Sequence, residues 1–199
     1  MSIFCIAGLS GTGKSTLAKI IAKRLDIPLV ISYTTRPKRP TEQNGIDYYF
    51  IDDQTYDVIN DSLVAKESFE VDGGYIWRYG FHKSDVLGNK NVLCVINPKG
   101  IQDLKNDGVT NIVPILIEVD ETERINRILS RNDNQTKAEI KRRTNKDKQM
   151  FEHFKPQYNI INDDLEKCVQ EIIDVINKES DKQRYEELYS WINSRANCC

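Results

Sequence analysis

The chain has 199 residues, of which 39% are hydrophobic, and this length suits one compact domain with a buried core. Lysine and arginine total 28 against 30 for aspartate and glutamate, so the net charge of -2 argues against a polybasic surface for nucleic acid or anionic membrane. No apolar run has the length of a bilayer span, and the five cysteines lack the spacing of a disulfide framework or zinc site. We expect a cytoplasmic protein, monomeric or homodimeric, without nucleic-acid or membrane partners.

Along the chain, apolar runs alternate with helical patterns. Strands are predicted at 2–7, 92–96, 112–118 and 158–161, and helices from Lys14 onward, at about 98–106, at 121–131 and after 161. Such alternation is typical of an α/β fold with a mostly parallel sheet covered by helices on both faces. Ligands of this fold gather at the carboxyl ends of the strands.

Two polar stretches interrupt this rhythm, and we interpret both as insertions into a single domain over residues 1–199. The predicted parts are a core of 1–31, 81–131 and 150–177, insertions at 32–80 and 132–149, and a C-terminal helical extension at 178–199.

The first strand and helix enclose a phosphate-binding motif. Residues 8–15 read GLSGTGKS and match the pattern GxxxxGK[ST] in its required context between strand and helix. Glycines at 8, 11 and 13 let successive backbone N–H groups face one concavity, and the helix start adds its positive end. Lys14 can reach the β- and γ-phosphates of ATP, and the Ser15 hydroxyl is the expected ligand of the accompanying Mg²⁺. The predicted ATP-binding residues are Gly8, Ser10, Gly11, Thr12, Gly13, Lys14, Ser15 and Thr16.

The first insertion opens with a second candidate anion site. The segment SYTTRPKRPTEQNGIDYYF, at 32–50, places Arg36 and Arg39 three residues apart in a stretch stiffened by prolines, with several hydroxyl groups nearby. Arginine forks bind phosphate bidentately, so the segment could hold an acceptor phosphate. Taken alone, a solvated basic turn explains it equally well.

Together these segments resemble the guanylate kinase family of nucleoside monophosphate kinases. The resemblance covers residues 1 to about 177 and includes the phosphate loop, the 32–50 segment, the Tyr79-Gly80 pair, the arginine-rich 127–143 segment and YNIINDDLEKCV. It implies a P-loop NTPase core, in which 32–80 binds the acceptor nucleotide and 132–149 is a lid.

By position, the resemblance also implies roles for individual residues. Those expected to hold the acceptor phosphate are Ser32, Arg36, Arg39, Tyr48 and Tyr79. Those expected to contact the ATP phosphates and the transferring group are Arg127, Arg131 and Arg143, so the expected catalytic set is Lys14, Arg36, Arg39, Arg127, Arg131 and Arg143. We expect Lys137, Lys141 and Lys146 to be solvated.

The chain departs from the family pattern where the base is read. An ungapped alignment places Ala65 at the position of a base-reading Glu, with Glu67 as the nearest carboxylate on the same strand face. Val95 and Asn97 stand where the family carries two aspartates. Asn97 can accept a hydrogen bond through its amide oxygen, and Glu67 can replace the missing Glu or remain an exposed strand residue.

The sequence therefore predicts an ATP-dependent nucleoside monophosphate kinase, with GMP or dGMP as the leading acceptor. Three alternatives stay open at this point: a kinase for another (d)NMP, a catalytically inactive guanylate kinase-like binding module, and a P-loop kinase for a small molecule that is not a nucleotide.

Overall fold

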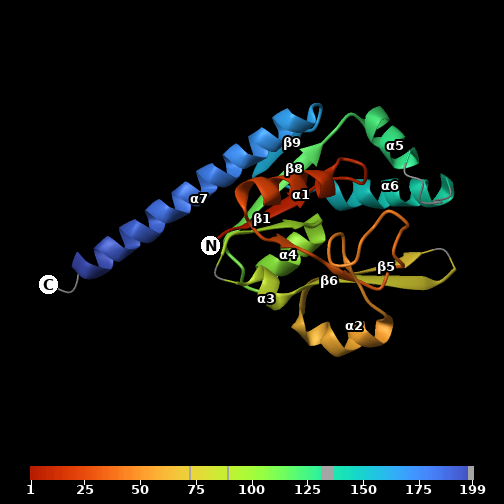
Figure 1. The fold of residues 1–199 in the computed structure, drawn as a ribbon, viewed down its shortest axis with the longest axis horizontal. Coiled ribbons are helices and arrows are strands. Elements are labelled where there is room, and N and C mark those ends of the chain that lie inside the picture. The colour runs from red at the N-terminus through yellow and green to blue at the C-terminus, as the bar shows by residue number, and fades with distance from the viewer. Residues whose placement is uncertain (72, 89, 131–136, 197–199) are drawn as a thin grey trace.

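The computed structural model describes residues 1–71, 73–88, 90–130 and 137–196, with the backbone alone at 137–143, 192 and 194–196. At its centre lies a five-stranded parallel sheet in the order β2-β7-β1-β8-β9 (Figure 1). Its strands are β1 (Ile3–Ala7), β2 (Leu29–Val30), β7 (Val92–Val95), β8 (Ile112–Glu118) and β9 (Tyr158–Ile161). The predicted α/β fold with a parallel central sheet is confirmed.

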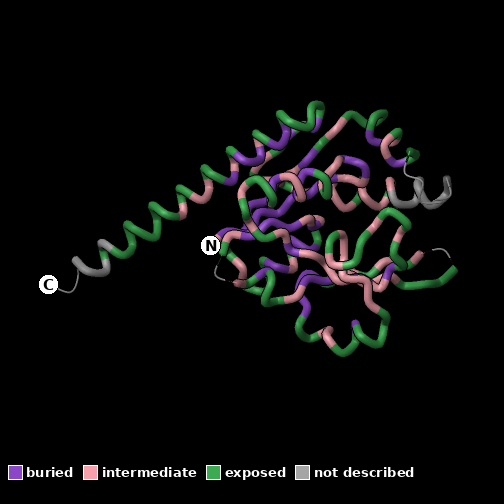
Figure 2. Tube along the Cα trace, in the orientation of Figure 1, coloured by how far each residue is buried: buried purple, intermediate pink, exposed green. Residues whose placement is uncertain are grey.

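Helices cover both faces of this sheet. Phe4 and Ile6 of β1 pack with α1 (Lys14–Leu25) and the first half of α7 (Leu165–Ala196), whereas Ile3 and Cys5 pack toward α4 (Pro98–Asn106). Because successive side chains of a strand point to opposite faces, burial on both sides explains why β1 reads as one uninterrupted apolar run. The core thus runs through the sheet and lies on both of its faces (Figure 2).

A second sheet is formed within the first insertion. It has four strands in the order β4-β3-β6-β5 and lies below the central sheet in the view of Figure 1. The strands are β3 (Tyr33–Thr34), β4 (Tyr49–Phe50), β5 (Leu63–Val71) and β6 (Tyr75–His82), accompanied by α2 (Asp53–Ile59), the 3₁₀ helix η1 (Asn60–Ser62) and α3 (Lys83–Val86). Long β5 and β6 form an antiparallel hairpin, one face of which turns toward the phosphate loop.

Two further helices, α5 (Glu121–Leu129) and α6 (Lys137–Phe151), lie near the carboxyl edge of the central sheet. The C-terminal extension is no separate helix, because α7 contains neither glycine nor proline and continues unbroken from the core into its protruding second half (Figure 1). Ser2 Oγ donates to Gln183 over 2.8 Å and tethers the base of this extension to the N-terminus. None of the described helices is both long and apolar enough to cross a membrane.

Candidate active site

The phosphate loop connects β1 to α1 through a backbone that only glycine can follow at two points. Gly8 has a φ of +156°, and a Cβ there would lie 2.5 Å from the carbonyl oxygen of Ile117. Gly11 has a φ of +91°, and a Cβ there would lie 2.7 Å from the carbonyl oxygen of Arg124. The helix start after Gly13 has no side-chain cap, so its first N–H groups can bind an anion.

The side chains of the loop divide into inward and outward groups. Thr12 is buried, and its hydroxyl donates to the Leu9 carbonyl over 3.0 Å, which shapes the loop from within. Lys14 Nζ donates to the same carbonyl over 2.8 Å and lines the cavity beside the loop. Ser15 and Thr16 are exposed at the start of α1. The loop can therefore receive a polyphosphate on its outer side.

Two residues that sequence reasoning missed brace this loop from behind. Asn162, 3% exposed, donates from Nδ2 to the Thr12 carbonyl over 2.8 Å. Arg124, 1% exposed, donates from Nη1 to the Ser10 carbonyl over 3.2 Å. Asn162 directly follows β9, and a polar residue at the carboxyl end of a parallel strand was a usable signal. Arg124 carried no such signal among the arginines of α5.

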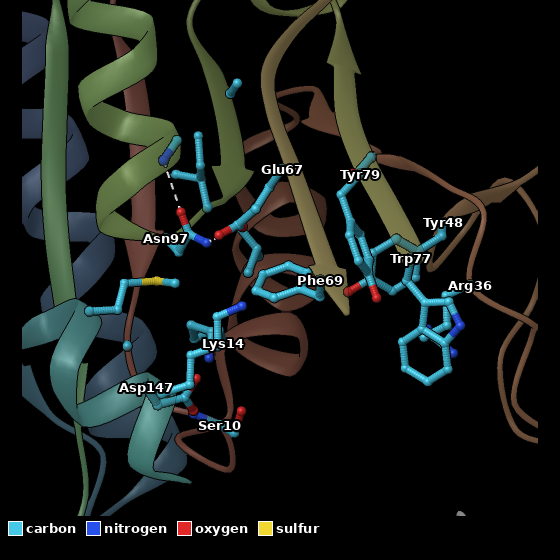
Figure 3. Close-up of a pocket in the computed structure, with 18 of the residues that line it drawn as sticks. Ser10, Lys14, Arg36, Tyr48, Glu67, Phe69, Trp77, Tyr79, Asn97 and Asp147 are labelled. Carbon is cyan, nitrogen blue, oxygen red and sulfur yellow. Dashed lines mark hydrogen bonds between the residues drawn. The ribbon is translucent and has the colours of Figure 1, made fainter. Parts of the chain in front are cut away.

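A cavity of about 250 Å³ extends from this loop to the second sheet (Figure 3). It gathers all seven residues predicted for the acceptor together with three of the loop, namely Gly8, Ser10, Lys14, Ser32, Arg36, Arg39, Tyr48, Glu67, Tyr79 and Asn97. These residues come from segments far apart in the chain. One cavity thus joins the predicted donor end to the predicted acceptor end.

Arg36 is the most buried charged group at the acceptor end. Its side chain is 5% exposed and donates to Glu42 Oε1 over 2.7 Å and to the Pro37 carbonyl over 2.8 Å. Burial opposes the charged form, but the bond to Glu42 and the nearby phenols outweigh it and raise the pKa of Arg36. The guanidinium is therefore a permanent positive charge, positioned by an internal carboxylate.

Aromatic side chains surround this charge. The guanidinium of Arg36 lies 5.2 Å from the Tyr48 ring centroid, and the Tyr48 and Tyr79 rings meet edge to face with centroids 6.1 Å apart. Burial is the main cause that raises the pKa of Tyr79, so its hydroxyl stays protonated at neutral pH and can donate a hydrogen bond. Ser32 Oγ contacts the Gly80 carbonyl on the neighbouring strand, 3.2 Å away. The arrangement can hold a dianionic phosphate with one fixed charge and several hydroxyl donors.

At the far end of the cavity, Glu67 and Asn97 face each other (Figure 3). The Nδ2 atom of Asn97 donates to Glu67 Oε2, while its Oδ1 atom accepts from the Gly100 N–H over 2.8 Å and caps α4. The amide oxygen through which we expect Asn97 to accept from a base thus already accepts one hydrogen bond in the helix cap, which leaves it one further lone pair. Burial raises the pKa of Glu67, and the bond from Asn97 opposes this rise.

A β-bulge explains why Glu67 reaches the cavity. Val64 pairs with Phe81 and Glu67 pairs with Tyr79, so β5 advances by three residues where β6 advances by two. The extra residue lies at the bulge, where Ala65 takes a φ of +49°. Ala65 and Glu67 both line the cavity, so the carboxylate missing at Ala65 is supplied two residues later.

Helix α6 closes the cavity from the other side. Ser10 N–H donates to Asp147 Oδ2 over 2.8 Å, and Lys146 Nζ lies 4.0 Å from the centroid of the Phe69 ring. The expectation that Lys146 is simply solvated is wrong, because its ammonium lies over this aromatic ring and its side chain lines the cavity.

The arginines expected at the transferring phosphate are only partly placed. Arg127 Nη1 lies 3.8 Å from the point where a side chain at Gly13 would begin, and the Arg127 guanidinium pairs with Glu123. Arg131 and the side chain of Arg143 lie outside the described residues, as do the side chains of Lys137 and Lys141.

The residues around the loop fit a cation that arrives with a nucleotide. Among the described residues, no group of three His, Cys, Asp or Glu side chains could hold a metal ion. Magnesium keeps several waters and needs only one or two protein oxygens beside substrate phosphates. The exposed Ser15 hydroxyl meets that requirement, whereas Val95 contributes no ligand.

The chain is similar to known proteins over most of its length. A family model described as "Guanylate kinase" matches residues 1–179. The guanylate kinase of Zymomonas mobilis is 30% identical over 190 residues, covering 92% of this chain and 86% of the relative. That of Mycoplasmopsis synoviae is 32% identical over 191 residues, covering 90% and 96%.

Solved structures share the fold. The crystal structure of guanylate kinase from Anaplasma phagocytophilum matches with a TM-score of 0.65 at 24% identity, covering 89% of this chain and 85% of that one. A gluconokinase from Sinorhizobium meliloti matches with a TM-score of 0.55 at 11% identity, covering 93% and 97%.

Proposed function

The chain belongs to the guanylate kinase family and is a nucleoside monophosphate kinase, and we propose that it transfers the γ-phosphoryl group of ATP to GMP or dGMP. The observation that carries this proposal is the single cavity shared by Lys14 of the phosphate loop and by Arg36, Tyr48 and Tyr79 of the second sheet. Two phosphates bound at its two ends would meet inside it.

The donor end would bind the β- and γ-phosphates of ATP. The backbone N–H groups of Gly11–Thr16 and the Lys14 ammonium would take the phosphate oxygens, with Arg124 and Asn162 keeping the loop in shape from behind. The Ser15 hydroxyl would hold the Mg²⁺ that accompanies ATP, and this ion would neutralise phosphate charge.

The acceptor end would position the second nucleotide. Arg36, Arg39 and Tyr48 would bind its phosphate together with Ser32 and Tyr79, and the base would extend toward Glu67 and Asn97. Because Arg36 is already oriented by Glu42, little side-chain entropy would be lost when the phosphate binds.

The transfer itself needs positioning and charge more than proton transfer. The attacking phosphate oxygen of the acceptor is already anionic, so no general base is required. Lys14 and Arg127 would stabilise the charge that spreads over the transferring group, joined by Arg131 and Arg143 from the 132–149 lid. Exclusion of water by the lid would favour transfer to the nucleotide over hydrolysis.

The cysteines support a reducing compartment. Cys5, Cys94 and Cys168 are buried free thiols, which is compatible with action in the cytoplasm.

A kinase panel tests the proposal. The purified protein with Mg-ATP should form ADP fastest with GMP or dGMP among the (d)NMPs, and Lys14→Ala should lower kcat at least about 10³-fold through lost transition-state charge stabilisation. Lys23→Ala, an exposed lysine on the same helix, is the matched control and should retain activity. Preference for a pyrimidine acceptor would reject the guanine assignment.

One observation favours a second candidate, a guanylate kinase-like module without turnover. Val95 offers no carboxylate to the outer shell of the metal ion. If the unaltered protein binds GMP but phosphorylates no NMP, this candidate replaces the kinase.

A further inference from the structure

The second half of α7 extends beyond the kinase domain. The family match ends at residue 179, whereas α7 continues without a break to Ala196 (Figure 1). Residues 180–196, called the extension below, span about 25 Å at the rise of an α-helix. The nucleotide site gives this part of the chain no role, so its side chains need an explanation of their own.

One side of the extension is attached to the domain. Ser2 Oγ donates to Gln183 Oε1 over 2.8 Å, and the N-terminal ammonium of Met1 lies 3.6 Å from Glu187 Oε1. Ser180 Oγ accepts a hydrogen bond over 3.0 Å from the loop that precedes β7. Ser180, Gln183 and Glu187 share one helix face because they are spaced i, i+3 and i+7. The beginning of the chain therefore lies along this face.

Large apolar side chains gather on the other side of the extension. Tyr185, Leu188 and Tyr189 follow the spacing i, i+3 and i+4, and their side chains are 74%, 52% and 69% exposed. Trp191, which is 53% exposed, borders them further toward the C-terminus. We call these four residues the apolar stripe. At about 100° of turn per residue, the centre of the first three lies roughly 160° around the helix from the attached face.

The apolar stripe consequently faces away from the domain that carries it. The bonds of Gln183 and Glu187 to the N-terminus fix which side of α7 meets the domain. Because α7 is continuous, the stripe cannot turn inward without breaking the helix or these bonds. Most of the extension is accordingly exposed in Figure 2. A cover for the stripe has to come from another molecule.

The area of the stripe is sufficient for pairing with a second copy. A Tyr or Trp side chain has about 150–250 Å² of surface, so the exposed fractions correspond to roughly 500 Å² in one chain. This equals the largest apolar patch of a typical monomer. Two such stripes would bury roughly 1,000 Å², which is the lower limit for a specific interface before flanking polar side chains are added.

The charges around the stripe also fit a second copy. Residues 178–193 contain three basic and four acidic side chains, a net charge of -1, namely Lys178, Lys182 and Arg184 against Glu179, Asp181, Glu186 and Glu187. An anionic membrane attracts helices with a basic polar face, and a strongly charged partner needs a surface of the opposite sign. A nearly neutral surface meets neither requirement, but it lets two identical helices approach without strong repulsion.

We propose that the apolar stripe is a dimer interface, in which the extensions of two chains pack antiparallel about a two-fold axis near Leu188. Each stripe covers the other, as a two-fold axis requires. The antiparallel arrangement sets opposite ends of the two helix dipoles side by side. It also separates the two kinase domains, because each domain lies at the base of its own extension (Figure 1). The dimer goes beyond the proposed function and needs no nucleotide.

Sedimentation equilibrium of the full chain without nucleotide tests the dimer. Between about 1 and 200 μM, the range in which a small interface dissociates, the mass should rise from that of one chain, 23.0 kDa, toward twice this value. A mass of 23.0 kDa at every concentration overturns the proposal. Binding of such a monomer to phosphatidylserine vesicles would assign the stripe to a membrane instead.

Two matched variants locate the interface. Leu188→Glu places a carboxylate beside its own copy on the two-fold axis, so the Kd of the dimer should rise at least about 100-fold. Ser190→Glu adds the same charge to the same helix at an exposed position, roughly 160° around the helix from Leu188, and should change the Kd less than about threefold. If both variants weaken the dimer equally, or neither does, its interface lies elsewhere. Circular dichroism of each monomer shows whether α7 is still formed.

Small-angle X-ray scattering tests the orientation of the two chains. The antiparallel pair places the domains at opposite ends of a shared helix pair, so the distance distribution should show two maxima, one within a domain and one between domains. A compact dimer with a single maximum would overturn the antiparallel arrangement. Because these measurements need no substrate, their failure leaves the proposed kinase function untouched, and a loss of phosphoryl transfer leaves the dimer untouched.

Discussion

The backbone N–H of Ser10 donates to Asp147 Oδ2 over 2.8 Å, so a carboxylate from α6 lies against the phosphate loop. Gly8, Lys14 and Lys146 line the same cavity as Asp147. The Asp147 carboxylate therefore occupies a backbone N–H group of a loop whose N–H groups are suited to binding phosphate oxygens.

Removal of this negative charge should strengthen ATP binding. Asp147→Asn should lower the Kd for ATP about fivefold, because one charge near a phosphate is worth ~1 kcal/mol at high effective dielectric. Calorimetry at low and high salt measures it, and the gain should shrink as salt screens the charge. Asp181→Asn, an exposed residue of α7, is the matched control. Unchanged or weaker ATP binding by Asp147→Asn would contradict the prediction.

The ion pair between Arg36 and Glu42 should make stability depend on acid pH. Burial alone would raise the pKa of Glu42, but bonds from Arg36 and from the Arg39 N–H hold it below its ordinary value of 4.5. A carboxylate with a lowered folded pKa contributes stability above its unfolded pKa and loses it as pH falls through the folded pKa. The unaltered protein should therefore lose stability below about pH 4.5.

The variant Glu42→Gln measures that contribution. Near neutral pH it should lower the free energy of unfolding by about 3 kcal/mol, because it leaves a buried guanidinium without its anion. The difference between variant and unaltered protein should narrow as Glu42 becomes protonated. Urea unfolding over the acid range records both trends, with exposed Glu186→Gln as the control. If the difference in free energy of unfolding between Glu42→Gln and the unaltered protein does not vary with pH, the Arg36–Glu42 ion pair does not stabilise the fold as predicted.

The phosphate loop should not tolerate a side chain at Gly11. A Cβ there would lie 2.7 Å from the Arg124 carbonyl oxygen at a φ of +91°. Gly11→Ala should cost about 3 kcal/mol of stability, since it adds a backbone clash to the strain of the left-handed conformation. Gly108 has a similar φ of +84° with nothing within 4 Å, so Gly108→Ala should cost only about 1 kcal/mol. Thermal unfolding compares them, and equal losses would refute the clash.

The buried thiols should resist alkylation in the folded protein. Burial raises the pKa of Cys168 to about 11. The pKa of Cys5 is also raised, mainly by its hydrogen bond with Cys94 and to a smaller extent by burial. At about pH 8 only ~0.1% of the Cys168 thiol would be ionised, and the thiolate is the reactive form. Mass spectrometry after iodoacetamide treatment should find Cys5 and Cys168 unmodified until urea is added. Modification before unfolding would show that these positions open.

Much of the core was predictable because its signals are local. The runs at 112–118 and 158–161 became β8 and β9 with the same bounds, since short, mostly apolar runs that alternate with helical patterns are typical of strands in a parallel sheet. The single long α7 was less evident, because its apolar periodicity fades after Lys178 although nothing in it breaks a helix.

The polar end of the cavity was less predictable. The bulge at Ala65 depends on how β5 pairs with β6, and a shift of one residue reverses the face of every side chain beyond it. The roles of Arg124 and Asp147 depend on the packing of α5 and α6 against a loop more than a hundred residues earlier in the chain. No local pattern contains that information.

The sequence by itself determined the phosphate loop, because the glycines at 8, 11 and 13 followed by Lys14 and Ser15 form a motif of consecutive residues that only a phosphate-binding backbone path requires. It also determined the kinase family, through the order of its motifs. Only the tertiary structure decided how Glu67 and Asn97 are arranged in the cavity. The cap of α4 orients the Asn97 amide, and the bulge turns Glu67 toward it, so an amide donor and a carboxylate meet across segments that the sequence separates.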